Sequence, residues 1–299
     1  MVDYGHPLSF GISIDPTSTD FAEHLALAQQ ADRAGLEYLA VQDHPYQSTH
    51  LDALSLMTTL VERTERISVL SDVLDLQLRP PTMLAKAASS VATMAGGRVQ
   101  LGVGGGASAQ GIAAMGGTPR RGSDMVAFTE EAIEILRRAL RGGVVASDTE
   151  QHQIAGYQAG PRPPRPIEVW VGSQRPRMLG VTGRVGDGWV CPLNIYVRPD
   201  EVAERQELID EAARSVGRDP RDIRRVYNVT GAIGPFRGGN GLVGPADLWV
   251  ETLSDWAVRL GFDTFIFWPA AEPSAQLALF STDVIPAVRR RVAELRAQA

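Results

Sequence analysis

Short apolar runs alternate with longer amphipathic segments along nearly the whole chain. The runs have the length of β-strands, and the segments between them carry apolar residues at the spacing of one helix face. The predicted strands are residues 8–14, 38–42, 67–74, 99–103, 167–171, 189–192, 223–233 and 264–268. The predicted helices are residues 20–34, 53–64, 80–94, 125–140, 177–184, 200–216, 245–260 and 274–295.

Eight successive strand–helix units predict a (β/α)8 barrel, the TIM barrel. Strands that are apolar on both faces belong in a parallel sheet covered by helices. A doubly wound open sheet is the alternative, because alternation alone does not close a sheet. Residues 141–166, where a short hairpin is predicted around 144–154, and the Gly/Pro-rich loop 234–244 interrupt the alternation. We interpret them as insertions after strands four and seven of one domain spanning 1–299.

Composition narrows the class of protein. The 299 residues are 44% hydrophobic, enough for a large core, and the net charge of −6 argues against a nucleic-acid partner. Cys191 is the only cysteine, so an internal disulfide is excluded, and we interpret Cys191 as a buried apolar residue and not a nucleophile. Neither a signal peptide nor a membrane-spanning run is visible, which predicts a cytoplasmic protein with no membrane partner.

Function in such barrels collects at the C-terminal ends of the strands. Asp43, His44 and Pro45 follow the second strand. A histidine beside a carboxylate suits proton donation or abstraction near neutral pH. The alternative is an ordinary surface histidine that caps a loop. For Asp43 three roles are open: it orients the ring, binds a ligand or only ends the strand.

Two glycine-containing turns are candidate ligand sites. Residues 102–107 resemble a dinucleotide turn, but they follow the fourth strand and lack a good phosphate-binding helix. We therefore predict a backbone against which a flat ring system lies. Residues 172–177 open a helix, and their free N–H groups with two arginines predict a phosphate-binding turn. The alternative there is an ordinary N-cap by Ser173.

Other chemistries have little support in the sequence. The five histidines include no HxH or HxxxH pair, and the only candidate metal set, a weak one, is His44, His50 and Asp52. No G-x-S-x-G motif is present, so serine hydrolysis has no support.

Five segments together carry a family resemblance. They are residues 31–44 ending in GLEYLAVQDH, 79–89 (RPPTMLAKAAS), 96–106 (GGRVQLGVGGG), 175–189 (RPRMLGVTGRVGDGW) and 261–268 (GFDTFIFW). With them the chain resembles the luciferase-like monooxygenase superfamily, especially its branch that depends on the deazaflavin coenzyme F420. The resemblance extends from about residue 10 to 288.

The resemblance implies roles for individual residues. Asp43 and His44 match a pair whose histidine faces the reactive carbon of the deazaflavin. Asp72 and Val73 match the place where many members have a non-prolyl cis peptide behind the ring. The other implied cofactor-binding residues are Gly105 and Gly106 beside the ring, and Gly172, Ser173, Gln174, Arg175, Arg177 and Met178 in the phosphate-binding turn.

The resemblance also implies an activity. We expect hydride transfer between F420 and a small organic substrate, by a homodimer. Relatives that oxidise glucose 6-phosphate carry glutamate where this chain has Ala107, which argues against a sugar-phosphate substrate. The alternatives are an FMN-dependent monooxygenase, a non-catalytic flavin-binding barrel and a metal-dependent barrel lyase.

Overall fold

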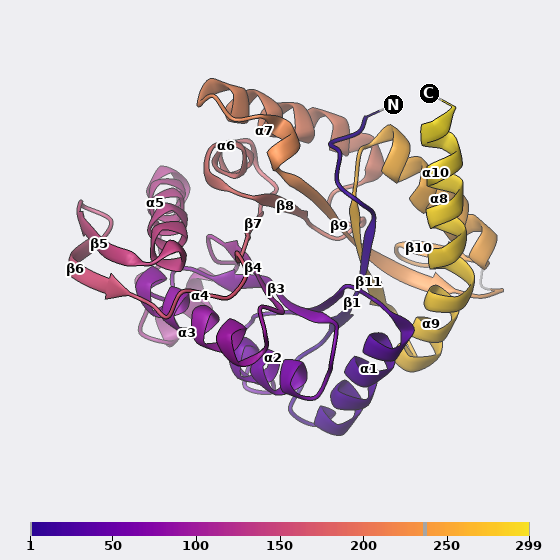
Figure 1. The fold of residues 1–299 in the computed structure, drawn as a ribbon, viewed down its shortest axis with the longest axis horizontal. Helices are drawn as coiled ribbons and strands as arrows, with labels where there is room; N and C mark the ends of the chain where they lie inside the picture. Colours follow the sequence, from indigo (N-terminus) through magenta and orange to yellow (C-terminus); the bar gives the residue numbers. More distant parts are fainter. Residues whose placement is uncertain (1, 236–237, 299) are drawn as a thin grey trace.

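Eight parallel strands close into a barrel in the computed structural model, which describes residues 2–235 and 238–298 (Figure 1). The barrel strands are β1 (Ser9–Ile14), β2 (Tyr38–Val41), β3 (Ser68–Asp75), β4 (Val99–Gly104), β7 (Val169–Gly172), β8 (Gly188–Cys191), β9 (Arg224–Ile233) and β11 (Thr264–Pro269). Each pairs in parallel with the next around the ring, and β9 pairs with both β11 and β8. This closure confirms the predicted TIM barrel and excludes the doubly wound sheet.

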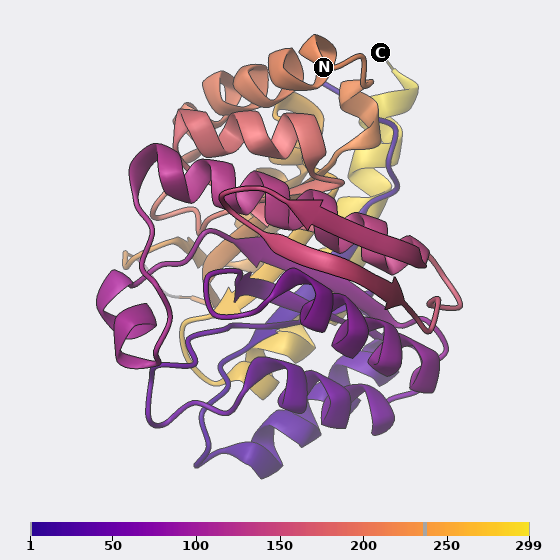
Figure 2. The same ribbon diagram turned by 90° about the vertical axis from the view of Figure 1, so that its left-hand side faces the viewer.

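Helices cover the outside of the barrel, as Figures 1 and 2 show. They are α1 (Phe21–Ala34), α2 (Ala53–Glu62), α3 (Pro81–Met94), α5 (Gly122–Arg141), α6 (Pro176–Val185), α7 (Val202–Ser215), α8 (Ala246–Arg259) and α10 (Ile285–Ala297). Within the described residues, no helix combines the length and the apolar character needed to cross a membrane.

Side-chain alternation along the strands divides the apolar residues between two cores. Phe10, Ile12 and Ile14 of β1 belong to the large core that includes the helices. A second, smaller cluster contains Trp170 and Ile266. Two residues beyond Ala40, Leu70 and Val226 of this cluster, on the same side of each strand, stand Gln42, Asp72 and Asn228, so this part of the interior becomes polar near the C-terminal ends.

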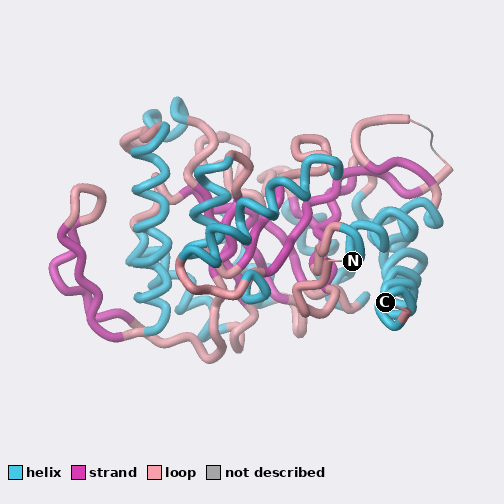
Figure 3. The backbone as a smooth tube through the Cα atoms, turned by 90° about the horizontal axis from the view of Figure 1, so that it is seen from above, coloured by secondary structure: helices cyan, strands magenta, loops and turns pink. Residues whose placement is uncertain are grey.

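The two insertions contain strands of their own. β5 (Gly143–Asp148) and β6 (Gln153–Ala159) form an antiparallel hairpin that stands outside the helix ring (Figure 3). The hairpin prediction is confirmed, although the pairing extends beyond 154. In the loop 234–244, β10 (Leu242–Gly244) pairs in parallel with β9, which the sequence did not predict. Gly231 permits this pairing, because a Cβ there would overlap the carbonyl of Leu242.

The helices of the structure differ from the predicted ones in three places. α4 (Ala109–Ala114) was not predicted, because its glycine-interrupted sequence looked unfavourable, but the Ser108 side chain caps it by accepting from the Gly111 N–H. α5 begins at Gly122, three residues before the predicted 125. The predicted helix 274–295 is divided into α9 (Pro273–Leu279), a π-helical turn and α10. Pro286 follows that turn and has no N–H to continue the regular bonding.

Candidate active site

A cavity of about 480 Å³ lies at the C-terminal ends of the strands. This volume lies within the range of pockets that hold small molecules and cofactors. The predicted site residues that line it are Asp43, His44, Asp72, Val73, Gly105, Gly106, Gly172, Ser173 and Gln174. The structure thus gathers residues from the ends of four strands, while the side chains of Arg175, Arg177 and Met178 lie outside the lining.

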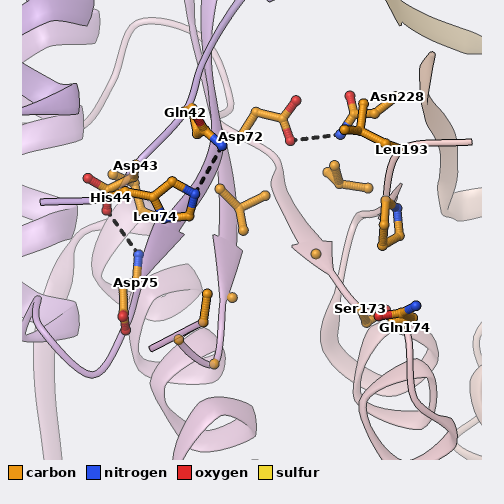
Figure 4. A pocket seen from close by; sticks show the side chains of 18 of the residues that line it. Gln42, Asp43, His44, Asp72, Leu74, Asp75, Ser173, Gln174, Leu193 and Asn228 are labelled. Carbon is orange, nitrogen blue, oxygen red and sulfur yellow. Dashed lines mark hydrogen bonds between the residues drawn. The ribbon is translucent and has the colours of Figure 1, made fainter. Parts of the chain in front are cut away.

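His44 is held by two polar neighbours in its own loop. The side-chain nitrogen of Gln42 lies 2.9 Å from Nε2 of His44, and the hydroxyl of Tyr46 lies 2.8 Å from Nδ1 (Figure 4 shows Gln42 and His44). In this arrangement the amide donates to Nε2, and Nδ1–H donates to the hydroxyl. Burial, followed by the nearby His50, lowers the pKa of His44 below its usual 6.5. The ring is therefore neutral at neutral pH.

Asp43 holds the loops around the histidine together. Its Oδ1 accepts from the guanidinium of Arg79 at 2.7 Å, and its Oδ2 accepts from the Asp75 N–H at 3.1 Å. Burial raises the pKa of the Asp43 carboxyl, and Arg79 opposes that shift. The ring-orienting role considered for Asp43 therefore belongs to Gln42 and Tyr46. Sequence reasoning missed Arg79, although it opens one of the segments that carry the resemblance.

The peptide bond between Asp72 and Val73 is cis, as the resemblance implied. The pairing of β3 with β4 shifts register at this bulge. The Val73 side chain occupies a notch, because a Cβ on Gly104 or Gly172 would lie 3.0 or 2.8 Å from its Cγ2. Gly102 borders the same notch, with a Cβ position 3.0 Å from Cγ1 of Val73.

The two glycines predicted to face a flat ring are also required by contacts within the protein. A Cβ on Gly105 would collide with Met125, and one on Gly106 would lie 2.9 Å from Oδ1 of Asp75. Gly106 also has a φ of 91°, which favours glycine. Both glycines line the cavity, and their close contacts with Met125 and Asp75 require glycine whether or not a ring lies against them.

The Val73 notch leads to a stability prediction. Gly172→Ala is expected to lower the free energy of unfolding by about 1–3 kcal/mol, because the new methyl group would displace Val73. Urea unfolding of the purified protein measures this change. Gly180→Ala in α6 is the control, since its Cβ meets only the flexible end of Arg184 at 3.0 Å. The control is expected to match the wild type or exceed it by up to about 1 kcal/mol. Unaltered stability in Gly172→Ala would contradict the notch.

The turn after β7 leaves its arginines exposed. α6 begins at Pro176, its N-cap residue is Arg175, and no side chain caps it. The alternative of an N-cap by Ser173 is wrong, because that hydroxyl lies 2.8 Å from Oγ1 of Thr182. Met178 is buried in the hydrophobic core. Arg175 and Arg177 are exposed and form no salt bridge with any other described residue, which leaves both available to an anionic group.

Two other candidates from the sequence have structural roles. Cys191 is fully buried, and burial raises the pKa of its thiol well above the usual 9.0, so the apolar interpretation is confirmed. Asp52, from the candidate metal set, caps α2 through the Ser55 N–H and also bonds Arg79. Across residues 2–235 and 238–298, no group of three or more histidine, cysteine or acidic side chains is placed to hold a metal.

The sequence of the chain is similar to those of known proteins. Residues 3–236 match the model of the luciferase-like monooxygenase family. The F420-dependent glucose-6-phosphate dehydrogenase of Gordonia bronchialis is 31% identical over 192 residues, which are 62% of this chain and 56% of that protein. The 5,10-methylenetetrahydromethanopterin reductase of Methanolobus tindarius is 28% identical over 220 residues, 72% of this chain and 63% of the reductase. The match thus spans somewhat more than half the length of these relatives.

Solved structures share the fold. An F420-dependent secondary alcohol dehydrogenase in complex with an F420–acetone adduct superposes with a TM-score of 0.83 at 16% identity, covering 94% of this chain and 99% of the other. The coenzyme F420-dependent tetrahydromethanopterin reductase of Methanopyrus kandleri superposes with a TM-score of 0.79, also at 16% identity, with the same coverage of both chains. Since the family model matches residues 3–236, well over half of the sequence, the chain belongs to the luciferase-like monooxygenase family.

Proposed function

We propose that this chain is an oxidoreductase that transfers a hydride between coenzyme F420 and a small organic substrate. One observation carries the proposal: His44 and the β3 bulge at Asp72 and Val73 line the same cavity at the C-terminal end of the barrel. The names of the F420-dependent dehydrogenases among the relatives support the choice of cofactor.

The residues around the cavity fit a deazaflavin. The notch for Val73 keeps the bulge in place on one wall, and Gly105 and Gly106 form part of the lining. Exposed Arg175 and Arg177 at the start of α6 fit a phosphate-bearing tail, because a helix N-terminus and guanidinium groups both favour anions. Bound F420 would accept or supply the hydride.

The proton that accompanies the hydride is assigned to His44. Its ring is neutral and Nε2 carries no proton, so that atom can accept one when a substrate is oxidised and return it in the reverse direction, and for this step the Gln42 amide, which donates to the same lone pair, has to turn its N–H away. Gln42 and Tyr46 fix the ring orientation. Asp43 and Arg79 hold the loop that carries the ring, and so act by positioning.

A side-by-side titration of the purified protein with F420 and with FMN, followed by fluorescence, tests the cofactor. Saturable F420 binding with much weaker FMN binding is expected. Preferential FMN binding would refute the F420 assignment and indicate a flavin monooxygenase of the same family, to be tested by oxygen consumption with reduced flavin. Binding of neither would refute the site assignment.

The assembly and the location stay predictions, the first from the resemblance and the second from the sequence itself. We expect a homodimer in the cytoplasm that acts on a small molecule. The mass of the particle from light scattering, compared with the 32.2 kDa of one chain, tests the dimer.

A further inference from the structure

Helix α4 packs against the tyrosine that holds His44. Gly111 lies in the middle of α4, and a Cβ at this position would overlap Cγ of Tyr46 and lie 2.6 Å from its Cδ1. The hydroxyl of the same tyrosine lies 2.8 Å from Nδ1 of His44. The missing side chain of Gly111 therefore lets the Tyr46 ring lie against the helix backbone while its hydroxyl reaches the histidine.

Two contacts hold α4 in this place. Ile112, the next residue of the helix, is 1% exposed. The segment 105–120 that carries α4 is closed at its base by Gln77, whose Nε2 donates to the Gly105 carbonyl and whose Oε1 accepts from the Arg120 N–H at 2.5 Å. Tyr46, in contrast, is only half-buried. A larger residue at position 111 would therefore displace the Tyr46 ring and not the helix.

The position of Tyr46 bears on the proton of His44. A neutral imidazole carries its proton on one of the two ring nitrogens, and the hydrogen-bond partners select which one. The Tyr46 hydroxyl accepts from Nδ1–H, which leaves Nε2 without a proton. Displacement of Tyr46 would free the proton to move to Nε2, and that nitrogen could then no longer accept one from a substrate.

We propose that Gly111 is a positioning residue for proton transfer: it seats the Tyr46 ring, and the Tyr46 hydroxyl then keeps the proton of His44 on Nδ1. The proposal rests on the proposed function for the role of His44, but the link between the three residues exists in the protein without cofactor. Helix α4 thus acts on the reaction although Gly111 lies outside the cavity lining.

Nuclear magnetic resonance of the protein alone tests this link. Long-range ¹H–¹⁵N spectra of the imidazoles at about pH 8, where His44 is neutral, show which ring nitrogen carries the proton, and His44→Ala identifies its signals. The wild-type ring is expected to be protonated at Nδ1, and Gly111→Ala is expected to shift it toward a mixture of both tautomers. A wild-type ring protonated at Nε2, or identical signals in the two proteins, would overturn the proposal.

Kinetics test the consequence for the reaction. With F420 and the first compound found to oxidise or reduce it, Gly111→Ala is expected to lower kcat by about 10- to 100-fold, since misplacing a reacting group by about 1 Å can have such an effect. KM and the dissociation constant for F420 should stay within about threefold of the wild type. Gln110→Ala, at an exposed position of the same helix, is the matched control and should behave like the wild type. An unchanged kcat in Gly111→Ala refutes the proposal.

A second substitution separates positioning from a general structural role. In Tyr46→Ala the ring is absent, so adding Gly111→Ala should change kcat by less than about threefold. An equal loss in both backgrounds shows that Gly111 acts elsewhere and overturns the proposal.

The same pair of variants covers a failure to fold. If Gly111→Ala is unfolded alone but folds together with Tyr46→Ala, the contact is confirmed, and Tyr46→Phe takes its place in the spectra, where unchanged His44 signals overturn the proposal. If neither protein folds, the ring is not what the methyl group meets, and the proposal is wrong. If no compound reacts with F420, the proposed function fails, while the spectra still decide whether Gly111 sets the state of His44.

Discussion

His44→Ala is expected to lower kcat/KM for hydride transfer by about 10²- to 10⁴-fold, the usual contribution of a general acid–base group. The compound used is the first that a substrate screen shows to oxidise or reduce F420. The dissociation constant for F420 should stay within about threefold of the wild type, which is less than ~1 kcal/mol. Stopped-flow absorbance of the deazaflavin measures the rate, and fluorescence titration measures the binding.

Two further variants separate proton transfer from positioning. Tyr46→Phe removes the group beside Nδ1 and leaves the ring, so its loss should be smaller than that of His44→Ala. His6→Ala is the matched control, because His6 precedes β1 at the opposite end of the barrel from the cavity. An unchanged rate in His44→Ala would remove its catalytic role. Intact F420 binding with no turnover of any compound by the wild type would favour the non-catalytic flavin-binding barrel.

Asp72→Asn is expected to raise the free energy of unfolding by about 3 kcal/mol above pH 6. Burial raises the pKa of the Asp72 carboxyl from 3.8 to about 6, against the opposing hydrogen bond from Asn228. The folded protein therefore binds a proton more readily than the unfolded chain, and stability falls as pH rises from about 4 to about 6. A difference of about two pKa units corresponds to about 3 kcal/mol. Asparagine carries no charge and escapes this loss.

Urea unfolding at about pH 8 and about pH 4.5 measures this difference. The advantage of Asp72→Asn should shrink to about 1 kcal/mol at the lower pH, where the carboxyl is largely protonated in the fold. The exposed substitution Asp148→Asn should stay within about 0.5 kcal/mol of the wild type at both. An Asp72→Asn variant that is less stable than the wild type at about pH 8 would contradict the burial argument.

Local patterns predicted the fold and much of the site. The alternation of strands and helices gave the barrel, because each unit can be recognised within about 30 residues. His44 could be singled out because it follows a strand in such a barrel. The cis peptide at Asp72 came only from the family resemblance, since nothing in its neighbouring residues requires it.

The contacts that complete the site could not be seen in the sequence. Arg79 bonds Asp43 across 36 residues, and Asn228 bonds Asp72 across 156. Periodicity carries no information about such pairs, because the closed sheet and not the local chain brings them together. α4 was missed because a single serine cap, at Ser108, decides whether so short a segment becomes helical.

The glycine notch around Val73 limits how this protein can be redesigned. Gly102, Gly104 and Gly172 all border the same side chain, so enlarging any one of them would move the bulge before it reshaped the cavity. A library aimed at new substrates should leave these positions fixed. Leu193 and Tyr196 also line the cavity, and Tyr196 as a residue is 63% exposed, so its variation disturbs little packing. Randomising this pair offers changed selectivity with the scaffold intact.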